Sequence, residues 1–334
     1  MQRLELLKTW LTTDVGIESF SIEPASSDAS FRRYFRVRPL GTDTSLIVMD
    51  APPTHEDTGP FVKIARMMIG YGMNVPEIKQ VDAKQGFLLL SDLGSTQYLE
   101  QLDASNVEQL YADALESLFR LQLHGPRQAG ELPPYDHPLL MREMELFREW
   151  YLTKHLGLTL TRQQHAMLDR TFEQLAQSAL QQPLVSVHRD YHSRNLMLTD
   201  ENNPGVLDFQ DAVIGPVTYD LVSLLRDCYI AWPRERVESW ALDYLSRARD
   251  AGIHTETDRQ CLLRWFDLMG VQRHLKAAGI FARLNYRDGK PGYLKDIPRT
   301  LSYVADVSQR YEALQEFYTF IQLTVPDIPK VTAK

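Results

Sequence analysis

The chain has few cysteines, no excess of positive charge and no long apolar run, and each absence excludes a class of protein. Its two cysteines, Cys228 and Cys261, are far apart, so neither a disulfide framework nor a thiolate metal site is indicated. The net charge of -8 argues against a nucleic-acid partner. No stretch approaches the ~18 apolar residues of a membrane helix, and the N-terminus has no signal-peptide pattern. We therefore expect a cytoplasmic protein with no nucleic-acid, membrane or obligate protein partner.

The length and composition are those of an ordinary globular protein. The chain has 334 residues, of which 44% are hydrophobic and 24% charged. Such a length usually forms about two lobes or domains with ample interior for a core. These bounds leave the function open, so it has to be sought in local motifs.

One motif near the middle of the chain organises the rest. An apolar run leads into His188-Arg189-Asp190, and Asn195 follows the aspartate. A turn rich in Asp, Asn, Pro and Gly and a second apolar run then lead to Asp208 and Phe209. This order predicts a β-hairpin with one aspartate in the loop before it and another where it ends. A His-Arg-Asp triplet, a spaced asparagine and a later Asp-Phe pair are typical of protein-kinase-like phosphotransferases.

The chemistry of phosphoryl transfer assigns roles to these residues. It needs Mg²⁺ held against the phosphates of ATP and a carboxylate that orients the acceptor hydroxyl and takes its proton. We predict that Asp190 is this base. Asn195 and Asp208 are the predicted Mg²⁺ ligands, because magnesium prefers oxygen donors. His192 and Arg194, inside the loop, are expected to face phosphate or acceptor.

The region before the motif departs from the usual kinase pattern. A kinase places a glycine-rich loop and a strand lysine here, whereas this chain has a Ser-, Asp- and Ala-rich turn and Met49 at the lysine position. We predict that Ser30, Arg32 and Arg33 around that turn contact ATP. The helix expected over 61–71 contains no carboxylate, so both partners of the usual Lys–Glu pair are missing.

These segments together predict an α+β, two-lobe, protein-kinase-like fold. Residues 1–94 form the smaller lobe, an antiparallel sheet with helices, of which the first dozen residues are a docked amphipathic helix. A hinge at 91–94 follows, in which Asp92 and Leu93 contact the adenine of ATP. Residues 95–334 form a mostly helical lobe that contains the catalytic loop, 188–195, and the metal-binding strand end, 206–211.

Three segments of the helical lobe allow two interpretations each. The charged stretch 141–145 is either a solvated helix face, which we favour, or part of an acceptor pocket. Asp220, at a predicted helix start, either caps that helix or braces the catalytic loop. The polar, aromatic segment 285–293 is either an exposed loop or a contact for a sugar.

Two helix starts in this lobe have a clear signal in the sequence. A capping box is expected at 105–108 and another at 161–164.

The motif residues resemble those of a known family. His188 to Asn195, Asp208-Phe209-Gln210-Asp211-Ala212 and Tyr219-Asp220-Leu221 are similar to the aminoglycoside phosphotransferase superfamily, whose members phosphorylate small molecules on a kinase-like fold. More closely, the segments 46–53, 206–212 and 272–290 resemble the bacterial anomeric kinases of N-acetylmuramate and N-acetylglucosamine. In that group Met49 is part of the pattern.

This resemblance implies transfer of a phosphoryl group from ATP to the anomeric C1 hydroxyl of an amino sugar, in recycling of peptidoglycan sugar. The carboxylate of N-acetylmuramate calls for a cation, for which position alone suggests Arg194, Arg226, Arg283 and Arg287. A kinase of choline, homoserine or an aminoglycoside on the same fold is a first alternative. A nucleotide-binding pseudokinase is the second, motivated by the missing lysine and glycines.

Overall fold

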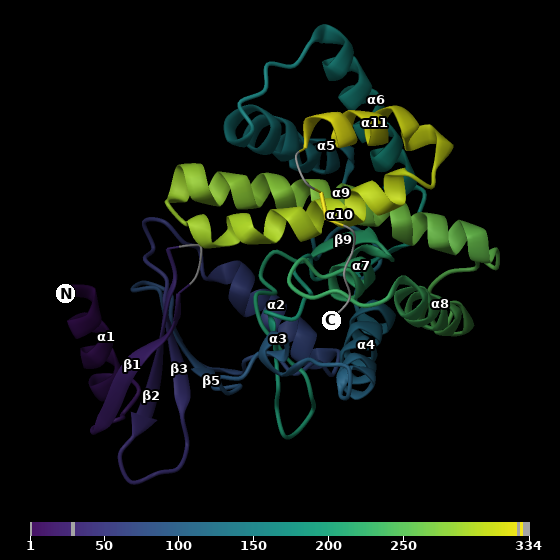
Figure 1. Ribbon diagram of the computed structural model, residues 1–334. Helices are drawn as coiled ribbons and strands as arrows, with labels where there is room; N and C mark the ends of the chain where they lie inside the picture. The colour runs from purple at the N-terminus through teal and green to yellow at the C-terminus, as the bar shows by residue number, and fades with distance from the viewer. Residues whose placement is uncertain (1, 28–30, 326–327, 330–334) are drawn as a thin grey trace. The chain divides into compact units, whose positions relative to one another are not determined.

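The computed structural model describes residues 2–27, 31–325 and 328–329, which form two compact units (Figure 1). Unit 1 consists of Met1–Gln101 and Arg194–Asp211, and unit 2 of Leu102–Ser193 and Ala212–Lys334. We predicted a single division at residue 94. The segments 95–101 and 194–211 belong to unit 1 because backbone hydrogen bonds tie them to it. The Leu198 N–H donates to the Thr96 carbonyl at 2.8 Å, and the Val206 N–H to the Asn74 carbonyl at 2.7 Å.

Unit 1 is built on a five-stranded sheet in the order β1-β2-β3-β5-β4, in which every neighbouring pair is antiparallel. This confirms the expected sheet. The helices and strands of unit 1 are α1 (Gln2–Thr13), β1 (Phe20–Ser27), β2 (Arg33–Pro39), β3 (Leu46–Asp50), α2 (Gly59–Gly70), β4 (Ile78–Asp82), β5 (Phe87–Ser91), α3 (Tyr98–Gln101), β7 (Leu196–Met197) and β8 (Gly205–Val206).

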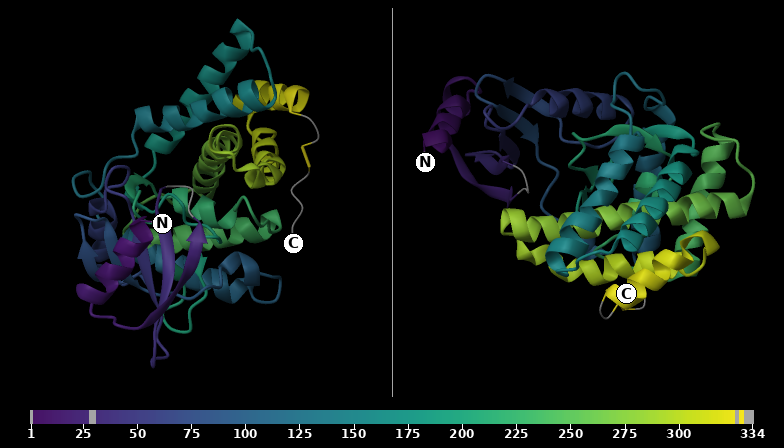
Figure 2. Two further views of the ribbon diagram at one scale, coloured as in Figure 1. Left: turned by 90° about the vertical axis from the view of Figure 1, so that its left-hand side faces the viewer. Right: turned by 90° about the horizontal axis from the view of Figure 1, so that it is seen from above.

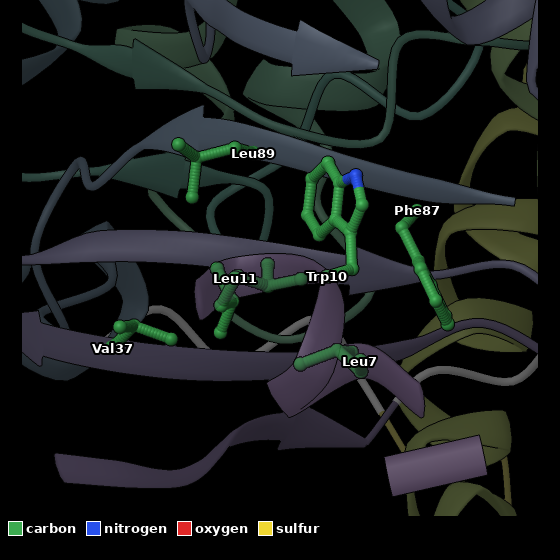
Figure 3. Packing of buried hydrophobic residues seen from close by; sticks show 7 residues of the cluster. Leu7, Trp10, Leu11, Val37, Phe87 and Leu89 are labelled. Carbon is green, nitrogen blue, oxygen red and sulfur yellow. The ribbon is translucent and has the colours of Figure 1, made fainter. Parts of the chain in front are cut away.

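Helix α1 packs on one face of this sheet (Figure 3). Its Leu7, Trp10 and Leu11 recur at helical spacing and are buried against side chains of β2, β3 and β5. The Trp10 ring lies 5.7 Å from the ring of Phe87, which comes from β5. The predicted docked amphipathic helix is thus confirmed, and burial of its apolar stripe stabilises it.

The opposite face of the sheet carries Met49. Successive residues of a strand point to opposite faces, so Met49 faces away from the neighbouring Val48, which packs with α1. Met49 is fully buried and pairs in register with Leu88. An apolar side chain therefore fills the strand position where a kinase would present its lysine.

Unit 2 is mostly helical and is arranged along the 30-residue helix α9. Helices α9 and α10 lie side by side, seen lengthwise in Figure 1 and nearly end-on in the left view of Figure 2. The elements are α4 (Val107–His124), α5 (His137–Leu146), a π-helix (Phe147–His155), α6 (Arg162–Leu180), β6 (Leu184–Val187), β9 (Val213–Pro216), α7 (Tyr219–Leu225), α8 (Arg234–Asp250), α9 (Arg259–Asp288), a 3₁₀-helix (Pro291–Asp296), α10 (Ile297–Ser308), a 3₁₀-turn (Glu312–Leu314) and α11 (Gln315–Thr324). No helix in the described part of the chain is both long and apolar enough to cross a membrane.

Two helix ends differ from the sequence expectations. The capping box at 161–164 is confirmed, but the one at 105–108 is wrong. Helix α4 begins at Val107 without a side-chain cap, because the Asp103 carboxylate binds the N–H groups of Ser105 and Asn106 instead. Helix α9 continues to Asp288 and ends at Gly289, whose φ of 65° is the left-handed conformation favoured by glycine. Residues 285–288 of the segment 285–293, for which the sequence left an exposed loop or a sugar contact open, are therefore helical.

Gly279 allows α9 to touch another backbone. A Cβ atom at this position would lie 2.3 Å from the carbonyl carbon of Leu146 and 2.6 Å from the amide nitrogen of Phe147. These atoms mark the junction between α5 and the π-helix. Since both neighbours are backbone atoms, no side-chain rotation can relieve the contact.

We predict that Gly279→Ala destabilises the protein by about 1–3 kcal/mol, the usual range for overpacking a well-packed interior. The matched control is Gly70→Ala in α2, where an added Cβ meets no atom within 4 Å. Urea unfolding followed by circular dichroism measures both. Equal midpoints for Gly279→Ala and the wild type would contradict the packing described here.

Candidate active site

The loop after β6 is held by a buried carboxylate from α7. Asp220 accepts hydrogen bonds from the backbone N–H of His188 at 2.6 Å and of Arg189 at 3.0 Å. Asp220 is completely buried. Helix α7 has Thr218 at its N-cap, so bracing the loop, rather than capping the helix, is what Asp220 does.

A second carboxylate holds the other end of this loop. Asp227, just beyond α7, accepts hydrogen bonds from both the backbone N–H of Ser193 at 2.9 Å and the Ser193 hydroxyl. Between these two anchors Arg189 adopts a φ of 79°, a conformation that costs free energy in a residue other than glycine. The anchors at both ends explain how the strained backbone is maintained. The sequence analysis missed Asp227, although its short distance from Asp220 along α7 was a usable signal.

Glu143 of α5 is the centre of a buried ion network. It pairs with the guanidinium of Arg189 and lies 3.4 Å from the ammonium of Lys276 on α9. The Tyr135 hydroxyl donates to it as well, and Lys276 donates to the Tyr219 hydroxyl at 2.9 Å. The preference for a solvated face at 141–145 was therefore wrong at Glu143, which is 5% exposed.

Asp190 lies in a positively charged environment. Burial alone would raise its pKa, but Lys276, His192, Arg189 and Arg273 together hold the pKa below its usual range. Asp190 is therefore a carboxylate at neutral pH, which is the state required of a base. Asp220, in contrast, has its pKa raised to about 7 by burial and by the nearby negative charge of Asp190, although the two loop N–H groups favour the charged form.

Aromatic rings lie next to His192. The His192 ring meets the Tyr229 ring edge-on at 5.4 Å. Tyr229 lies 6.2 Å from Phe281 of α9, which in turn stacks on Tyr293 at 5.7 Å. This row joins the loop to the segment 285–293 that we considered as a sugar contact. Aromatic side chains offer the flat apolar surface on which one face of a sugar ring can lie.

In unit 1, a hairpin brings the two predicted metal ligands together. Strands β7 and β8 pair antiparallel, which confirms the predicted hairpin. The Asn195 amide lies 3.3 Å from one carboxylate oxygen of Asp208, and the Gln210 amide donates to the other at 2.7 Å. Asp208 has a φ of 64°, a second strained position in the motif. The Asn195 amide nitrogen thus donates to Asp208, and the oxygens of these two neighbouring side chains are of the type that Mg²⁺ takes from proteins.

The predicted hinge residues have structural partners within unit 1. The Asp92 carboxylate accepts from the Arg36 guanidinium at 3.0 Å, the Ser45 hydroxyl at 2.7 Å and the Gly94 N–H at 3.0 Å. Burial opposes ionisation of Asp92, but these donors lower its pKa. A contact with adenine would therefore use backbone groups of the hinge. Leu93 packs closely over Gly205 of β8, where a Cβ would come within 3.0 Å of the Leu93 side chain.

The other predicted ATP contacts are only partly described. Ser30 lies outside the described residues. Arg32 forms an ion pair with Glu56 at 3.1 Å. Arg33 forms an ion pair with the buried Asp50, and Arg3 of α1 pairs with the same carboxylate. A phosphate would share Arg32 or Arg33 with these carboxylates. Their role in binding ATP stays a prediction.

The four arginines suggested for an acceptor carboxylate lie in different settings. Arg226 is buried and paired with Asp267 of α9, so its charge has a structural partner. Arg287 is exposed and pairs with Asp288 at 2.8 Å. Arg283 is half-buried, and burial and the nearby Arg287 lower its pKa. Arg194 is half-buried at the start of the unit 1 segment that carries Asn195.

Solved structures show which fold the protein has. It resembles choline kinase from Cryptosporidium parvum with a TM-score of 0.63 and 11% identity, over 96% of this chain and 99% of that one. It also resembles aminoglycoside 2′-phosphotransferase-IIIa with a TM-score of 0.60 and 15% identity, over 93% and 100% of the two chains. The fold is therefore the α+β, kinase-like fold that we predicted.

Sequence comparison identifies the family. The model of the phosphotransferase enzyme family matches residues 21–259, and the chain belongs to that family. It is 48% identical over 324 residues to an N-acetylmuramate/N-acetylglucosamine kinase of Pseudomonas putida, covering 94% of both chains. It is 51% identical over 293 residues to a protein of the same name from Pseudomonas aeruginosa, covering 88% of this chain and 85% of the relative. The predicted phosphotransferase class is thus confirmed.

The raised pKa of Asp220 predicts a pH-dependent stability. In the folded protein the Asp220 carboxyl has a pKa of about 7, whereas in the unfolded chain its pKa is near 4. This carboxyl therefore contributes its full stabilisation below about pH 4 and loses it as pH rises through 7. We expect the difference in free energy of unfolding between the wild type and Asp220→Asn to decrease as pH rises from about 4 to 7, as measured by urea unfolding. Asp243→Asn, at an exposed aspartate of α8, serves as the control, and a constant difference for Asp220→Asn would contradict this assignment.

Proposed function

We propose that this phosphotransferase moves the γ-phosphoryl group of ATP to the anomeric C1 hydroxyl of N-acetylmuramate and N-acetylglucosamine. The observation that carries the proposal is the identity of 44–51% to three N-acetylmuramate/N-acetylglucosamine kinases. In two of these comparisons the likeness covers at least 94% of both chains. The products are sugar 1-phosphates, which suit the recycling of peptidoglycan sugar in the cytoplasm, where ATP is available.

Asp190 orients the C1 hydroxyl and accepts its proton. An anomeric hydroxyl is more acidic than an ordinary alcohol, so a carboxylate with a lowered pKa suffices as a base late in the transfer. The two anchors of the loop, Asp220 and Asp227, limit its movement and so hold Asp190 in position. Such fixed geometry is the main contribution a protein makes to phosphoryl transfer.

Asn195 and Asp208 would hold Mg²⁺. The donor set fits, since the two side chains lie within hydrogen-bonding distance on one hairpin. Gln210 donates to Asp208 and so orients the carboxylate, as the outer partners of metal ligands commonly do. When bound, the metal neutralises charge on the phosphates of ATP.

The charge around Asp190 favours an acidic or neutral acceptor over a cationic one. Arg189, Arg273 and Lys276 all contribute positive charge near this carboxylate. Choline and aminoglycosides are cations, which this environment would repel. The likeness to a choline kinase and an aminoglycoside phosphotransferase, at 11% and 15% identity, supports the common fold alone.

A panel of acceptors tests the proposed reaction. We expect release of ADP with N-acetylmuramate and N-acetylglucosamine in the presence of ATP and Mg²⁺, and product resonances of a 1-phosphate in phosphorus NMR. Glucose, choline and kanamycin are the comparison acceptors, for which turnover should be at least about 10-fold lower because they lack the matching polar groups. Turnover on choline or kanamycin alone would replace the proposed substrates. Binding of ATP without turnover of any acceptor would favour the pseudokinase.

A single substitution tests the base. Asp190→Asn should fold normally and lose about 10²–10⁴-fold in kcat, the range typical of removing a general base. Asp243→Asn on α8 is again the matched control and should retain wild-type kcat, since Asp243 is exposed and its only described hydrogen bond is to Ser239 of the same helix. A near-normal kcat for Asp190→Asn, with unchanged circular dichroism, would remove Asp190 from this role.

A further inference from the structure

Arg273 of α9 is a buried arginine without a carboxylate partner among the described residues. Its side chain is 5% exposed. Its one hydrogen-bond partner in the described part of the chain is the Cys228 sulfur at 3.8 Å, and its Nε atom has none. The pKa of the Cys228 thiol is raised by burial, so this thiol is neutral at physiological pH. Buried charges are normally paired, which makes Arg273 an exception that calls for an explanation.

The neighbouring buried cations do have partners. Arg226 pairs with Asp267, while Arg189 and Lys276 share Glu143. The two other buried carboxylates near the loop, Asp220 and Asp227, are engaged with N–H and hydroxyl groups of the loop. Arg273 lies near the charges of Asp190 and Asp227, but its Nε atom is buried and has no hydrogen-bond partner in the described part of the chain. That N–H group could donate to the oxygen of one further anion.

The position of Arg273 indicates which anion this is. Arg273 contacts Cys228, and the adjacent Asp227 binds Ser193 at the end of the loop. The guanidinium therefore lies beside the loop that carries the proposed base, and its charge interacts with Asp190. Lys276 follows three residues later on α9, which places both side chains on one face of the helix. Lys276 also influences Asp190. An acceptor whose hydroxyl reaches Asp190 would bring its other substituents within range of Arg273.

We propose that Arg273 binds the carboxylate of an acidic acceptor and so determines how well the enzyme uses N-acetylmuramate relative to N-acetylglucosamine. The inference rests on the proposed function. The two sugars differ by the lactyl ether, which carries the only carboxylate of N-acetylmuramate. A guanidinium suits a carboxylate because it can donate two parallel hydrogen bonds. Arg273 thus takes the role for which position in the sequence suggested Arg194, Arg226, Arg283 and Arg287.

The competing explanation is that Arg273 acts only on Asp190 or on the transferred phosphoryl group. In that case its removal would slow the reaction of every acceptor by the same factor. A carboxylate-binding role predicts a larger loss with the acidic sugar than with the neutral one. N-acetylglucosamine therefore provides an internal control that separates the two explanations.

The experiment measures kcat and KM of the full-length protein with both sugars and with the methyl ester of the N-acetylmuramate carboxylate. Arg273→Met removes the charge and keeps much of the volume, and Arg273→Lys keeps the charge without the planar fork. For Arg273→Met we expect kcat/KM to fall about 10- to 100-fold with N-acetylmuramate, the usual effect of losing a charged hydrogen bond. With N-acetylglucosamine, where only the charge beside Asp190 is lost, the fall should be at least about 5-fold smaller, and Arg273→Lys should recover part of the difference between the two sugars.

Arg264→Met is the matched control, since Arg264 is an exposed arginine of the same helix. It should change the ratio between the two sugars by less than about 2-fold, as expected of a surface substitution. The wild type should prefer N-acetylmuramate to its methyl ester, and Arg273→Met should treat them alike. The comparison of acid with ester in the wild type requires no variant to fold, so it tests the inference even where Arg273→Met is unstable.

Each outcome has a distinct meaning. Equal losses on both sugars, or a wild type that does not distinguish acid from ester, would overturn the role of Arg273 and leave the proposed reaction intact. A wild type inactive on both sugars would overturn the proposed function and this inference with it. A selective loss with the acid, partly restored in Arg273→Lys, would support the assignment.

Discussion

The site depends on the capture of backbone N–H groups by two buried carboxylates. Asp220 binds the amides at the start of the loop and Asp227 binds the amide at its end. A loop with a left-handed Arg189 would otherwise relax to a lower-energy backbone. Relaxation of the loop would be costly, because each buried N–H group left without a partner would destabilise the fold by about 1–3 kcal/mol. Asp220 lies in the first turn of α7 and Asp227 just beyond its end, so the orientation of one short helix determines the conformation of the loop.

The same constraint has an electrostatic consequence. Asp220, Asp190 and Glu143 bring negative charge into the interior of unit 2, and Arg189 and Lys276 compensate it. Burial penalises every one of these charges, and neighbouring opposite charges recover part of that cost. The balance differs between the carboxylates. The charges of Lys276, His192, Arg189 and Arg273 keep Asp190 ionised, whereas burial and the charge of Asp190 raise the pKa of Asp220. Two aspartates within one site thus have opposite properties.

Local patterns in the sequence predicted the elements that depend on local interactions. The hairpin of β7 and β8, the docking of α1 and the capping box at Thr161 follow from turn residues, helical periodicity and cap chemistry over a few positions. The neighbouring positions of Asn195 and Asp208 follow from the hairpin. For Asp220 the sequence left two roles open, and the structure distinguishes them because the partner amides are 31 and 32 residues away.

Contacts between distant segments could not be read from the sequence. Glu143 resembles a solvated residue on α5, since Arg142 and Glu145 beside it are charged. Its partners Arg189 and Lys276 come from two other segments. Arg273 and Lys276 stand in a helix that is buried on most sides, where no periodicity marks them as exceptional. The opposite holds in unit 1, where arginines that looked available for phosphate are paired with Glu56 and Asp50. The arginines near the sheet are thus engaged, whereas Arg273 has a buried Nε atom without a hydrogen-bond partner among the described residues, which favours unit 2 as the place where an anionic acceptor is recognised.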